Sequence, residues 1–350
     1  MTSSNLFVNT SRNVFKAEIY LKGKMEHYFI KKEDFSKFTS SLVKKKYEVI
    51  APLEIPRPDL GFNITTFSVL KEGDEVSHNH PRYPAKSFFL PQKEDLFEFE
   101  NGKFNETMPK KKRVVFLHRC DANALLIVDK MYAEGKYPDP YYTNLRNNTV
   151  LIDIPCIPTK HCFCTSMDLV DFFDLRFLKH KNGFFVEIGS KKGESLITPL
   201  FRKTNDDVKY KEPDCRKKLL HGKAKCAIYA RDYPEMWQEY QEKCLSCSAC
   251  TASCPTCSCF DVIDTVNFKA TKGKRQRAWA SCQGLDFTKV AGGYVFRKDR
   301  DKRVKQRIFC KLKYMYDIFG RARCVGCGRC VINCPTDIDI VKIANKLKCK

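Results

Sequence analysis

The stretch Cys244-Leu-Ser-Cys247-Ser-Ala-Cys250-Thr-Ala-Ser-Cys254-Pro255 decides the fold, and it has a second copy, Cys324-Val-Gly-Cys327-Gly-Arg-Cys330-Val-Ile-Asn-Cys334-Pro335. Both copies have the spacing C-x2-C-x2-C-x3-C-P, in which three thiolates bind one [4Fe–4S] cube and the fourth binds another. Two zinc knuckles are the alternative, but zinc ligands usually come as C-x2-C pairs and rarely as a four-Cys run closed by Pro. The two copies therefore predict two [4Fe–4S] clusters and a role in electron transfer.

The two copies also predict crossed ligation. In this pattern the first cluster is bound by Cys244, Cys247, Cys250 and Cys334, and the second by Cys324, Cys327, Cys330 and Cys254. Crossing brings the two cubes close together, as an electron relay requires. Uncrossed ligation, in which each copy binds its own cluster, is the alternative.

Composition places the chain among globular proteins of about two domains, with 350 residues of which 43% are hydrophobic. No apolar run approaches the roughly 20 residues that a bilayer crossing needs. The N-terminal stretch Met1–Arg12 lacks the apolar core of a secretory signal. We therefore expect a soluble, cytoplasmic protein that does not bind membranes. In such a protein 19 Cys indicate metal binding rather than disulfides.

The charge is strongly basic, with 63 Lys and Arg against 41 Asp and Glu, a formal net charge of +22. Part of this excess offsets the negative charge of thiolate-bound clusters. The remainder suits docking to an acidic partner, such as a ferredoxin or a flavoprotein. Nucleic-acid binding is the alternative for the Arg-rich residues 275–307. We disfavour it, because Lys and Arg beside clusters pair with their thiolates.

The pattern along the chain predicts an α/β N-terminal domain with a parallel or mixed sheet, followed by a mainly α-helical ferredoxin module that carries both motifs. The expected regions are an N-terminal extension (1–26), the α/β domain (27–201), a linker with some helix (202–235) and the module (236–350). The module is expected to be helical because 70 positions separate Cys254 from Cys324, and because Asp299–Phe319 has the character of one long helix.

A strand–helix–strand unit stands out within the α/β domain. Val114–Leu117 is a short apolar run, Ala122–Glu134 has helical periodicity with Asp121 placed as its N-cap, and residues 150–154 form another apolar run. Such a unit predicts parallel pairing of its two strands.

Four further cysteines are predicted to form a third [4Fe–4S] site in this domain: Cys120, Cys156, Cys162 and Cys164. Cys120 and Cys156 each follow a predicted strand, and the carboxyl ends of parallel strands share the edge of the sheet where ligands bind. Cys162 and Cys164 follow closely enough to fold back onto that edge. Buried structural thiols are the alternative, because free Cys packs as a small hydrophobe.

A fourth [4Fe–4S] site is considered within the module, from Cys257, Cys259, Cys282 and Cys310. The argument is the count of the remaining cysteines, and buried thiols are again the alternative. Cys215, Cys226 and Cys349 are then left over and are interpreted as loose thiols.

Taken together, these features resemble one known family. It comprises the iron–sulfur electron-transfer subunit of anaerobic sulfite reductase and the beta subunit of cytoplasmic [NiFe] sulfhydrogenase, and the resemblance covers roughly residues 27–345. It rests on Phe116–Leu125, Asp139–Tyr142, Cys156 with Cys162-Phe-Cys164, Cys244–Phe260, Trp279–Cys282, Ala291–Arg297 and Cys324–Pro335.

Some stretches favour one branch of this family over the other. The residues Cys162–Met167 and Trp279–Cys282 and the short C-terminal tail look more like the sulfite reductase branch. Cys310 and residues 184–193 look more like the hydrogenase branch. The chain departs from the family at Ser248, where Gly commonly appears, and neither this nor Tyr294 after two glycines removes a ligand.

The resemblance implies an electron-transfer subunit of an anaerobic oxidoreductase complex. Its partners would be a flavin-containing subunit that oxidises NAD(P)H and a terminal catalytic subunit, with a ferredoxin as a further candidate. A siroheme sulfite reductase is the main interpretation of the terminal subunit, and a [NiFe] (sulf)hydrogenase is the alternative. A self-contained iron–sulfur reductase is a third interpretation, which we disfavour because the sequence has no nucleophile–base arrangement. Since it also lacks a flavin or nicotinamide motif, we expect no catalytic residues of its own and no independent active site.

Overall fold

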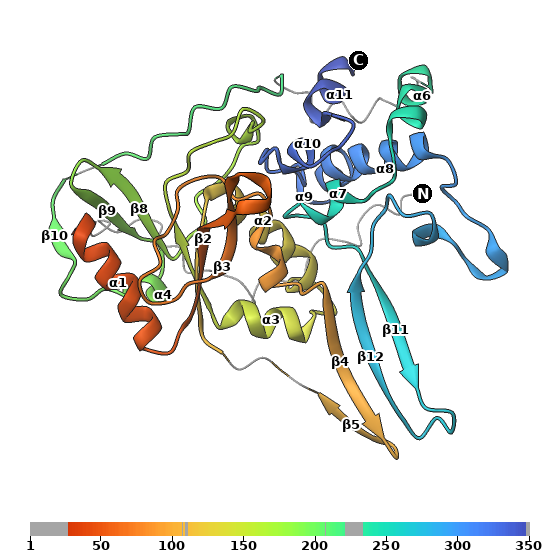
Figure 1. Cartoon of the computed structure of the whole chain (residues 1–350), viewed down its shortest axis with the longest axis horizontal. Coiled ribbons are helices and arrows are strands. Elements are labelled where there is room, and N and C mark those ends of the chain that lie inside the picture. The colour runs from red at the N-terminus through yellow and green to blue at the C-terminus, as the bar shows by residue number, and fades with distance from the viewer. Residues whose placement is uncertain (1–26, 107, 109–110, 207, 221–233, 348–350) are drawn as a thin grey trace, which may run out of the picture.

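The computed structural model describes residues 27–106, 108, 111–206, 208–220 and 234–347 (Figure 1). The predicted N-terminal extension, residues 1–26, lies outside the described residues. The same holds for residues 221–233 of the predicted linker, and for Cys226 and Cys349.

An eight-stranded sheet with the order β10-β1-β9-β8-β7-β6-β2-β3 forms the N-terminal part of the molecule. Its strands are β1 (His27–Lys31), β2 (Glu48–Arg57), β3 (Phe62–Val69), β6 (Arg113–Leu117), β7 (Thr149–Asp153), β8 (Leu175–His180), β9 (Gly183–Ile188) and β10 (Arg202–Thr204). The central strands β2, β6, β7 and β8 pair in parallel, and the outer pairs are antiparallel. The predicted mixed sheet and the parallel pairing of β6 with β7 are confirmed.

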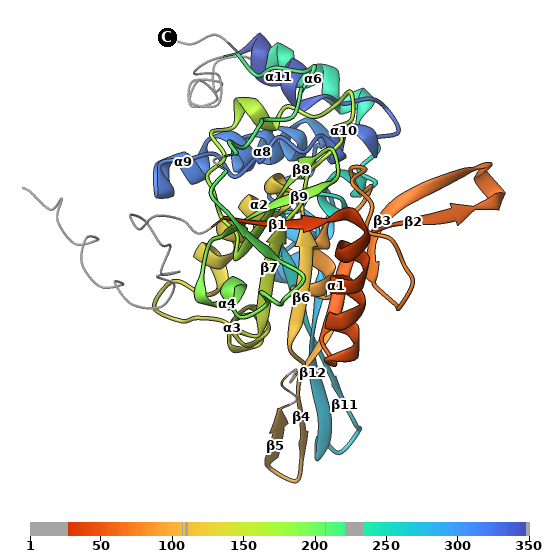
Figure 2. The ribbon, with the colours of Figure 1, turned by 90° about the vertical axis from the view of Figure 1, so that its left-hand side faces the viewer.

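Helices cover both faces of this sheet (Figure 2). They are α1 (Lys32–Lys44), α2 (Arg119–Tyr132), α3 (Pro140–Asn147) and the short α4 (Lys191–Glu194). The buried strand β6 shows why two layers are needed, because successive side chains point to opposite faces. Phe116 packs in one core cluster with Phe38 of α1, and Val115 packs in another with Leu125 of α2.

The start of α2 differs from the prediction. The helix begins at Arg119, its N-cap residue is His118, and no side chain caps it. Asp121 was predicted as the N-cap, but it lies inside the first turn and is 2% exposed. Its carboxylate accepts two hydrogen bonds from Arg329, each 2.7 Å long. The Asp121 carboxylate therefore binds the buried guanidinium of Arg329, and it does not accept hydrogen bonds from the first N–H groups of α2 as an N-cap would.

The C-terminal part contains helices around the two motifs. They are α6 (Pro234–Lys243), α7 (Ala249–Ala252), α8 (Arg300–Leu312), α9 (Tyr314–Phe319), α10 (Arg329–Ile332) and α11 (Ile340–Lys346). The expected long helix is thus two helices, which meet at Lys313, where the φ/ψ pair of −99° and −64° is distorted away from ideal helix geometry. In the described ranges, no helix has the length and apolar character needed to cross a membrane.

The expectation of a mainly helical module is wrong for residues 260–279. They form the hairpin β11 (Phe260–Val266) and β12 (Lys272–Trp279), which joins β4 (Lys93–Glu100) and β5 (Lys103–Glu106) in a second sheet. This sheet projects from the body of the molecule as an arm (Figure 1). Arg277 of β12 is buried and forms ion pairs with Glu94 and Asp139. These partners lie far away in sequence, so the polar residues of β12 show no local sign of a strand.

Candidate iron–sulfur sites

The two motif loops share one local conformation. Their third residues, Ser246 and Gly326, are both left-handed, with φ of 54° and 67°. In each loop the backbone N–H of this residue donates a hydrogen bond of 3.4 Å to the sulfur of the first cysteine, Cys244 or Cys324. The two copies of the motif therefore hold their first cysteines by the same turn and the same hydrogen bond.

The second loop needs glycine for a reason that the first loop lacks. A Cβ at Gly326 would lie 2.6 Å from Cα of Cys164, and one at Gly328 would lie 2.5 Å from the carbonyl oxygen of His161. The first loop has the same conformation with serines, including Ser248 at φ 64°. The conformation itself thus tolerates a side chain, and it is the close packing of residues 161–164 that excludes one from the second loop.

Two adjoining cavities hold the motif cysteines. The first is lined by Cys244, Cys247, Cys250 and Cys334, together with Cys330. The second is lined by Cys324, Cys327, Cys330 and Cys254. Cys254 thus lines the cavity of the other motif, and so does Cys334. Because Cys330 lines both cavities, they lie side by side.

Three buried cations lie beside the cysteines of this region, and within the described ranges none of them pairs with a carboxylate. They are Arg307, Lys311 and Arg323, which are 7%, 2% and 7% exposed. Arg307 donates to the sulfur of Cys257, and Arg323 donates to the sulfur of Cys310, each over 3.4 Å. Uncompensated buried charge is costly. The three cations therefore fit an interior that carries the negative charge of metal-bound thiolates.

The electrostatics of Lys311 support this fit. Its ammonium group donates to the hydroxyl of Thr256 over 2.8 Å. Burial acts to lower the pKa of Lys311, but the negative charges of Cys254 and Cys257 outweigh it and hold the pKa above its ordinary value. The lysine therefore stays charged in the interior when the thiols beside it are ionised.

The described side chains are not arranged for single metal ions. In the part of the chain that the structure describes, no group of three or more His, Cys, Asp or Glu residues is placed to hold one ion. A structural zinc ion needs four such ligands around one point, whereas a cube binds each thiolate at a different iron. The geometry thus gives no support to the zinc alternative.

The predicted N-terminal site gathers at the carboxyl edge of the parallel strands. Cys120 lies in the first turn of α2 just after β6, and Cys156 follows the end of β7. Cys164 packs against the cluster that contains Cys120, and Cys162 is close enough to Cys156 to act on its pKa. Cys120 and Cys162 are 5% and 2% exposed. Burial raises the pKa of Cys120 and of Cys156, and neighbouring thiolates add to the shift. Such thiols stay protonated unless a metal replaces the proton, so the donor set fits an iron–sulfur cluster.

A fifth cysteine lies at this site, and the sequence did not reveal it. Cys215 was interpreted as a loose thiol, but it is 3% exposed and its sulfur lies 3.4 Å from that of Cys164. The hydrogen bond between the two sulfurs lowers the pKa of Cys215 to about 6 and raises that of Cys164. Cys215 lies 51 residues beyond Cys164 in a polar segment, and no local pattern marks it.

The N-terminal site adjoins the second motif loop directly. The backbone N–H of Phe163 donates to the carbonyl oxygen of Gly326 over 2.8 Å, and the sulfur of Cys162 lies 3.6 Å from the carbonyl oxygen of Cys327. The fully buried Arg329 completes this contact through its ion pair with Asp121. The two sites are thus parts of one packed interior.

The fourth group of cysteines is only partly brought together. Burial raises the pKa of Cys259, and the nearby thiolates of Cys282 and then Cys310 contribute to the shift. The backbone N–H of Cys257 instead donates to the carbonyl oxygen of Cys254, which lines the second cavity, over 3.3 Å. The structure therefore groups Cys259, Cys282 and Cys310, and places Cys257 beside the second motif site.

Comparison with known proteins agrees with the motif geometry. Residues 243–338 match the family model of the 4Fe-4S dicluster domain, which establishes two [4Fe–4S] clusters as cofactors of the chain. Sulfhydrogenase 2 subunit beta of Pyrococcus furiosus is 33% identical over 299 residues, a match that covers 81% of this chain and 88% of the relative. No solved structure matches the chain.

Proposed function

This chain belongs to the family of sulfhydrogenase beta subunits, and from that premise we propose that it conducts electrons between the other subunits of an oxidoreductase complex. The sequence pattern favours a sulfite reductase as the terminal partner, with a hydrogenase as the alternative. The relative is named as a sulfhydrogenase subunit, so the alternative is the better supported interpretation. We therefore propose that the terminal partner is a hydrogenase subunit.

The observation that carries this proposal is the continuity of the thiol sites. Residues 162–164 pack on the second motif loop, and the second cavity shares Cys330 with the first. Electrons would then pass from the N-terminal site to the second motif cluster and on to the first, or in the reverse direction. Electron transfer needs short steps between centres, and a contiguous line of sites supplies them.

The cavity linings support crossed ligation within the pair. We propose that Cys334 binds the cluster of the first motif and that Cys254 binds the cluster of the second, since each lines only that cavity. A third cluster at the N-terminal cysteines is part of the proposal. A fourth cluster, from Cys257, Cys259, Cys282 and Cys310, stays a prediction.

The partner subunits are proposed from the family resemblance of the sequence. A flavin-containing subunit would exchange electrons with NAD(P)H at one end of the relay and the hydrogenase subunit would act at the other, while a ferredoxin is a further candidate partner. The proposal includes no nucleic-acid partner, and the cytoplasmic location stays a prediction. The formal net charge of +22 favours acidic docking faces on these partners.

The iron content checks the number of clusters. We expect about twelve Fe per chain for three [4Fe–4S] clusters in protein purified without oxygen. Anaerobic metal analysis with a protein determination by amino-acid analysis measures this ratio. A ratio of about eight would leave only the two motif clusters and contradict the third, whereas about sixteen would support the fourth.

The role as a conduit is checked in the assembled complex. Hydrogen-dependent reduction of NAD(P)⁺ should fall to background when Cys334→Ser removes a ligand of the first motif cluster. Hydrogen-dependent reduction of a viologen dye at the hydrogenase subunit should continue, because that subunit keeps its own active site. The isolated chain should be reduced by dithionite but not by NADH or NADPH.

Three results would contradict this function. One is a Cys334→Ser complex that still couples hydrogen to NAD(P)⁺ at the original rate. Another is rapid reduction of the isolated, flavin-free chain by NAD(P)H. The third is a complex that turns over sulfite but not hydrogen, which would restore the sulfite reductase interpretation.

A further inference from the structure

We infer that the imidazole ring of His80 donates a hydrogen bond to sulfur of the N-terminal cluster and so helps to set its reduction potential. This inference rests on the third cluster of the proposed function. It identifies a residue outside the cysteine set that acts on this cluster.

The His80 ring is buried without a hydrogen-bond partner. His80 is 8% exposed, and within the described part of the chain neither Nδ1 nor Nε2 of its ring has a partner. A histidine ring always carries at least one N–H donor, and a buried donor without an acceptor is costly. An acceptor for this ring must therefore come from a group other than the described protein atoms.

The neighbouring His118 shows the contrast. Its Nδ1 lies 3.3 Å from the carbonyl oxygen of Ile154, and its Nε2 lies 3.3 Å from that of Asn79. The backbone thus satisfies both nitrogens of one buried imidazole and neither nitrogen of the other.

The backbone around His80 lies along the segment that carries Cys156. Asn79 forms a parallel bridge with Ile157, and the backbone N–H of Ile157 donates to the carbonyl oxygen of His78 over 2.8 Å. Asn79 and Ile157 are both exposed. Because successive side chains of extended backbone point to opposite sides, the next residue on one strand, His80, and the preceding residue on the other, Cys156, share the inward side.

The surroundings of the ring place it at the start of α2. Its centroid lies 6.4 Å from that of the His118 ring, with 15° between the two planes, and His118 is the N-cap residue of α2, two positions before Cys120. On the other side, the carbonyl oxygen of Pro81 accepts a hydrogen bond of 2.8 Å from Nε of Arg329. The ring is thus held at the edge of the sheet where Cys120 and Cys156 lie.

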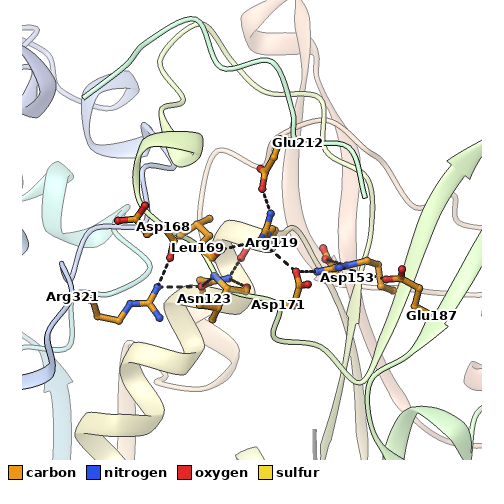
Figure 3. A network of polar contacts seen from close by, with 11 residues as sticks. Arg119, Asn123, Asp153, Asp168, Leu169, Asp171, Glu187, Glu212 and Arg321 are labelled. Carbon is orange, nitrogen blue, oxygen red and sulfur yellow. Dashed lines mark hydrogen bonds and ion pairs between the residues drawn. The ribbon is translucent and has the colours of Figure 1, made fainter. Parts of the chain in front are cut away.

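The start of α2 is itself fixed by a polar network (Figure 3). Arg119, the residue before Cys120, pairs with Glu212 and Asp171 and donates to the carbonyl oxygen of Leu169 over 2.8 Å. The helix end that carries Cys120 is therefore anchored, and a fixed donor beside it acts on the cluster with a defined geometry.

Cluster sulfur is the acceptor that this position offers. Hydrogen bonds to the sulfurs help to set the reduction potential of an iron–sulfur cluster. Reduction adds negative charge, and an N–H donor binds a more negative acceptor more strongly. Removal of the His80 donor should therefore make the N-terminal cluster harder to reduce.

Redox titrations monitored by EPR test this assignment in the full-length protein, purified without oxygen. The signal that Cys120→Ala removes identifies the N-terminal cluster. In His80→Phe the equilibrium constant for reducing this cluster should fall about tenfold, which is about 59 mV for one electron. His80→Gln keeps an N–H donor and should restore most of the potential. His78→Phe is the matched control and should leave the potential unchanged, because Nδ1 of His78 already has the carbonyl oxygen of Pro155 3.1 Å away.

Pulsed EPR of protein with isotope-labelled histidine gives a second readout. The reduced N-terminal cluster should show a weak nitrogen coupling that His80→Phe removes and His78→Phe keeps. Unaltered signals of the two motif clusters report that each variant is folded.

The outcomes that contradict the inference are distinct. An unchanged potential and an unchanged coupling in His80→Phe would overturn it, and so would a shift confined to the motif clusters. Loss of about four Fe in both His80→Phe and His80→Gln would overturn it as well, because the ring would then be a ligand and not a donor. Full iron in Cys120→Ala would instead show that the third cluster of the proposed function is absent.

Discussion

Replacing Arg329 with methionine should lower the free energy of unfolding by about 3–5 kcal/mol. Arg329 is 0% exposed and Asp121, its partner, is 2% exposed. The guanidinium donates two parallel hydrogen bonds of 2.7 Å to the carboxylate and a third, of 2.8 Å, to the carbonyl oxygen of Pro81. Methionine fills similar space but leaves the Asp121 carboxylate buried without a positive partner, and that uncompensated charge is the source of the cost.

An exposed ion pair of the same shape provides the matched control. Arg275 donates two bonds of 2.7 Å to Asp264 on the β11–β12 hairpin, with both side chains about half exposed. Exposed pairs of this kind contribute little because water solvates and screens both charges. Anaerobic urea unfolding, followed by far-UV circular dichroism, measures the free energy of unfolding. This free energy should fall strongly in Arg329→Met and change little in Arg275→Met. Equal effects of the two variants would contradict the role of burial.

The Arg329 variant also tests whether the N-terminal site and the second motif loop unfold together. Asp121 neighbours Cys120 in α2, while Arg329 lies between Cys327 and Cys330 in the second motif. The ion pair therefore ties the N-terminal site to the second motif loop. If Arg329→Met unfolds in two steps where the wild type unfolds in one, the pair is what makes the two parts cooperate.

Replacing Lys311 with methionine should lower the reduction potential of the second motif cluster by on the order of 100 mV. Lys311 is 2% exposed and lines the second cavity with Cys254, and the negative charges of Cys254 and Cys257 raise its pKa. Reduction adds one negative charge to a cluster, and a buried cation nearby stabilises that charge. A few ångströms away, at an effective dielectric constant near 20, this is worth about 2–4 kcal/mol, or about 90–170 mV for one electron.

The control for this prediction lies on the same helix. Lys302 is exposed and pairs with Asp299 at the start of α8, so Lys302→Met should leave every potential almost unchanged. Redox titrations monitored by EPR measure the potentials of both variants against the wild type. A Lys311→Met protein with unshifted potentials would show that the charge of this lysine does not act on the clusters.

Local spacing explains why part of this protein could be predicted. Three cysteines separated by two residues converge on one point whatever the rest of the chain does, so the motifs alone predicted a two-cluster module, and the dicluster match agrees. The apolar run before Cys120 predicted its strand, and parallel pairing predicted that Cys120 and Cys156 share one edge of the sheet. These inferences needed only chain geometry over short distances.

Only the tertiary structure showed the contacts that join distant segments. The contact of Cys164 with Cys215 spans 51 residues, the ion pair of Arg277 with Glu94 spans 183, and that of Arg329 with Asp121 spans 208. In sequence each of these is an isolated polar residue or thiol, which water would solvate equally well in a loop. Each acquires its role when packing removes the water, because a buried charge or sulfur must then find its partner within the protein.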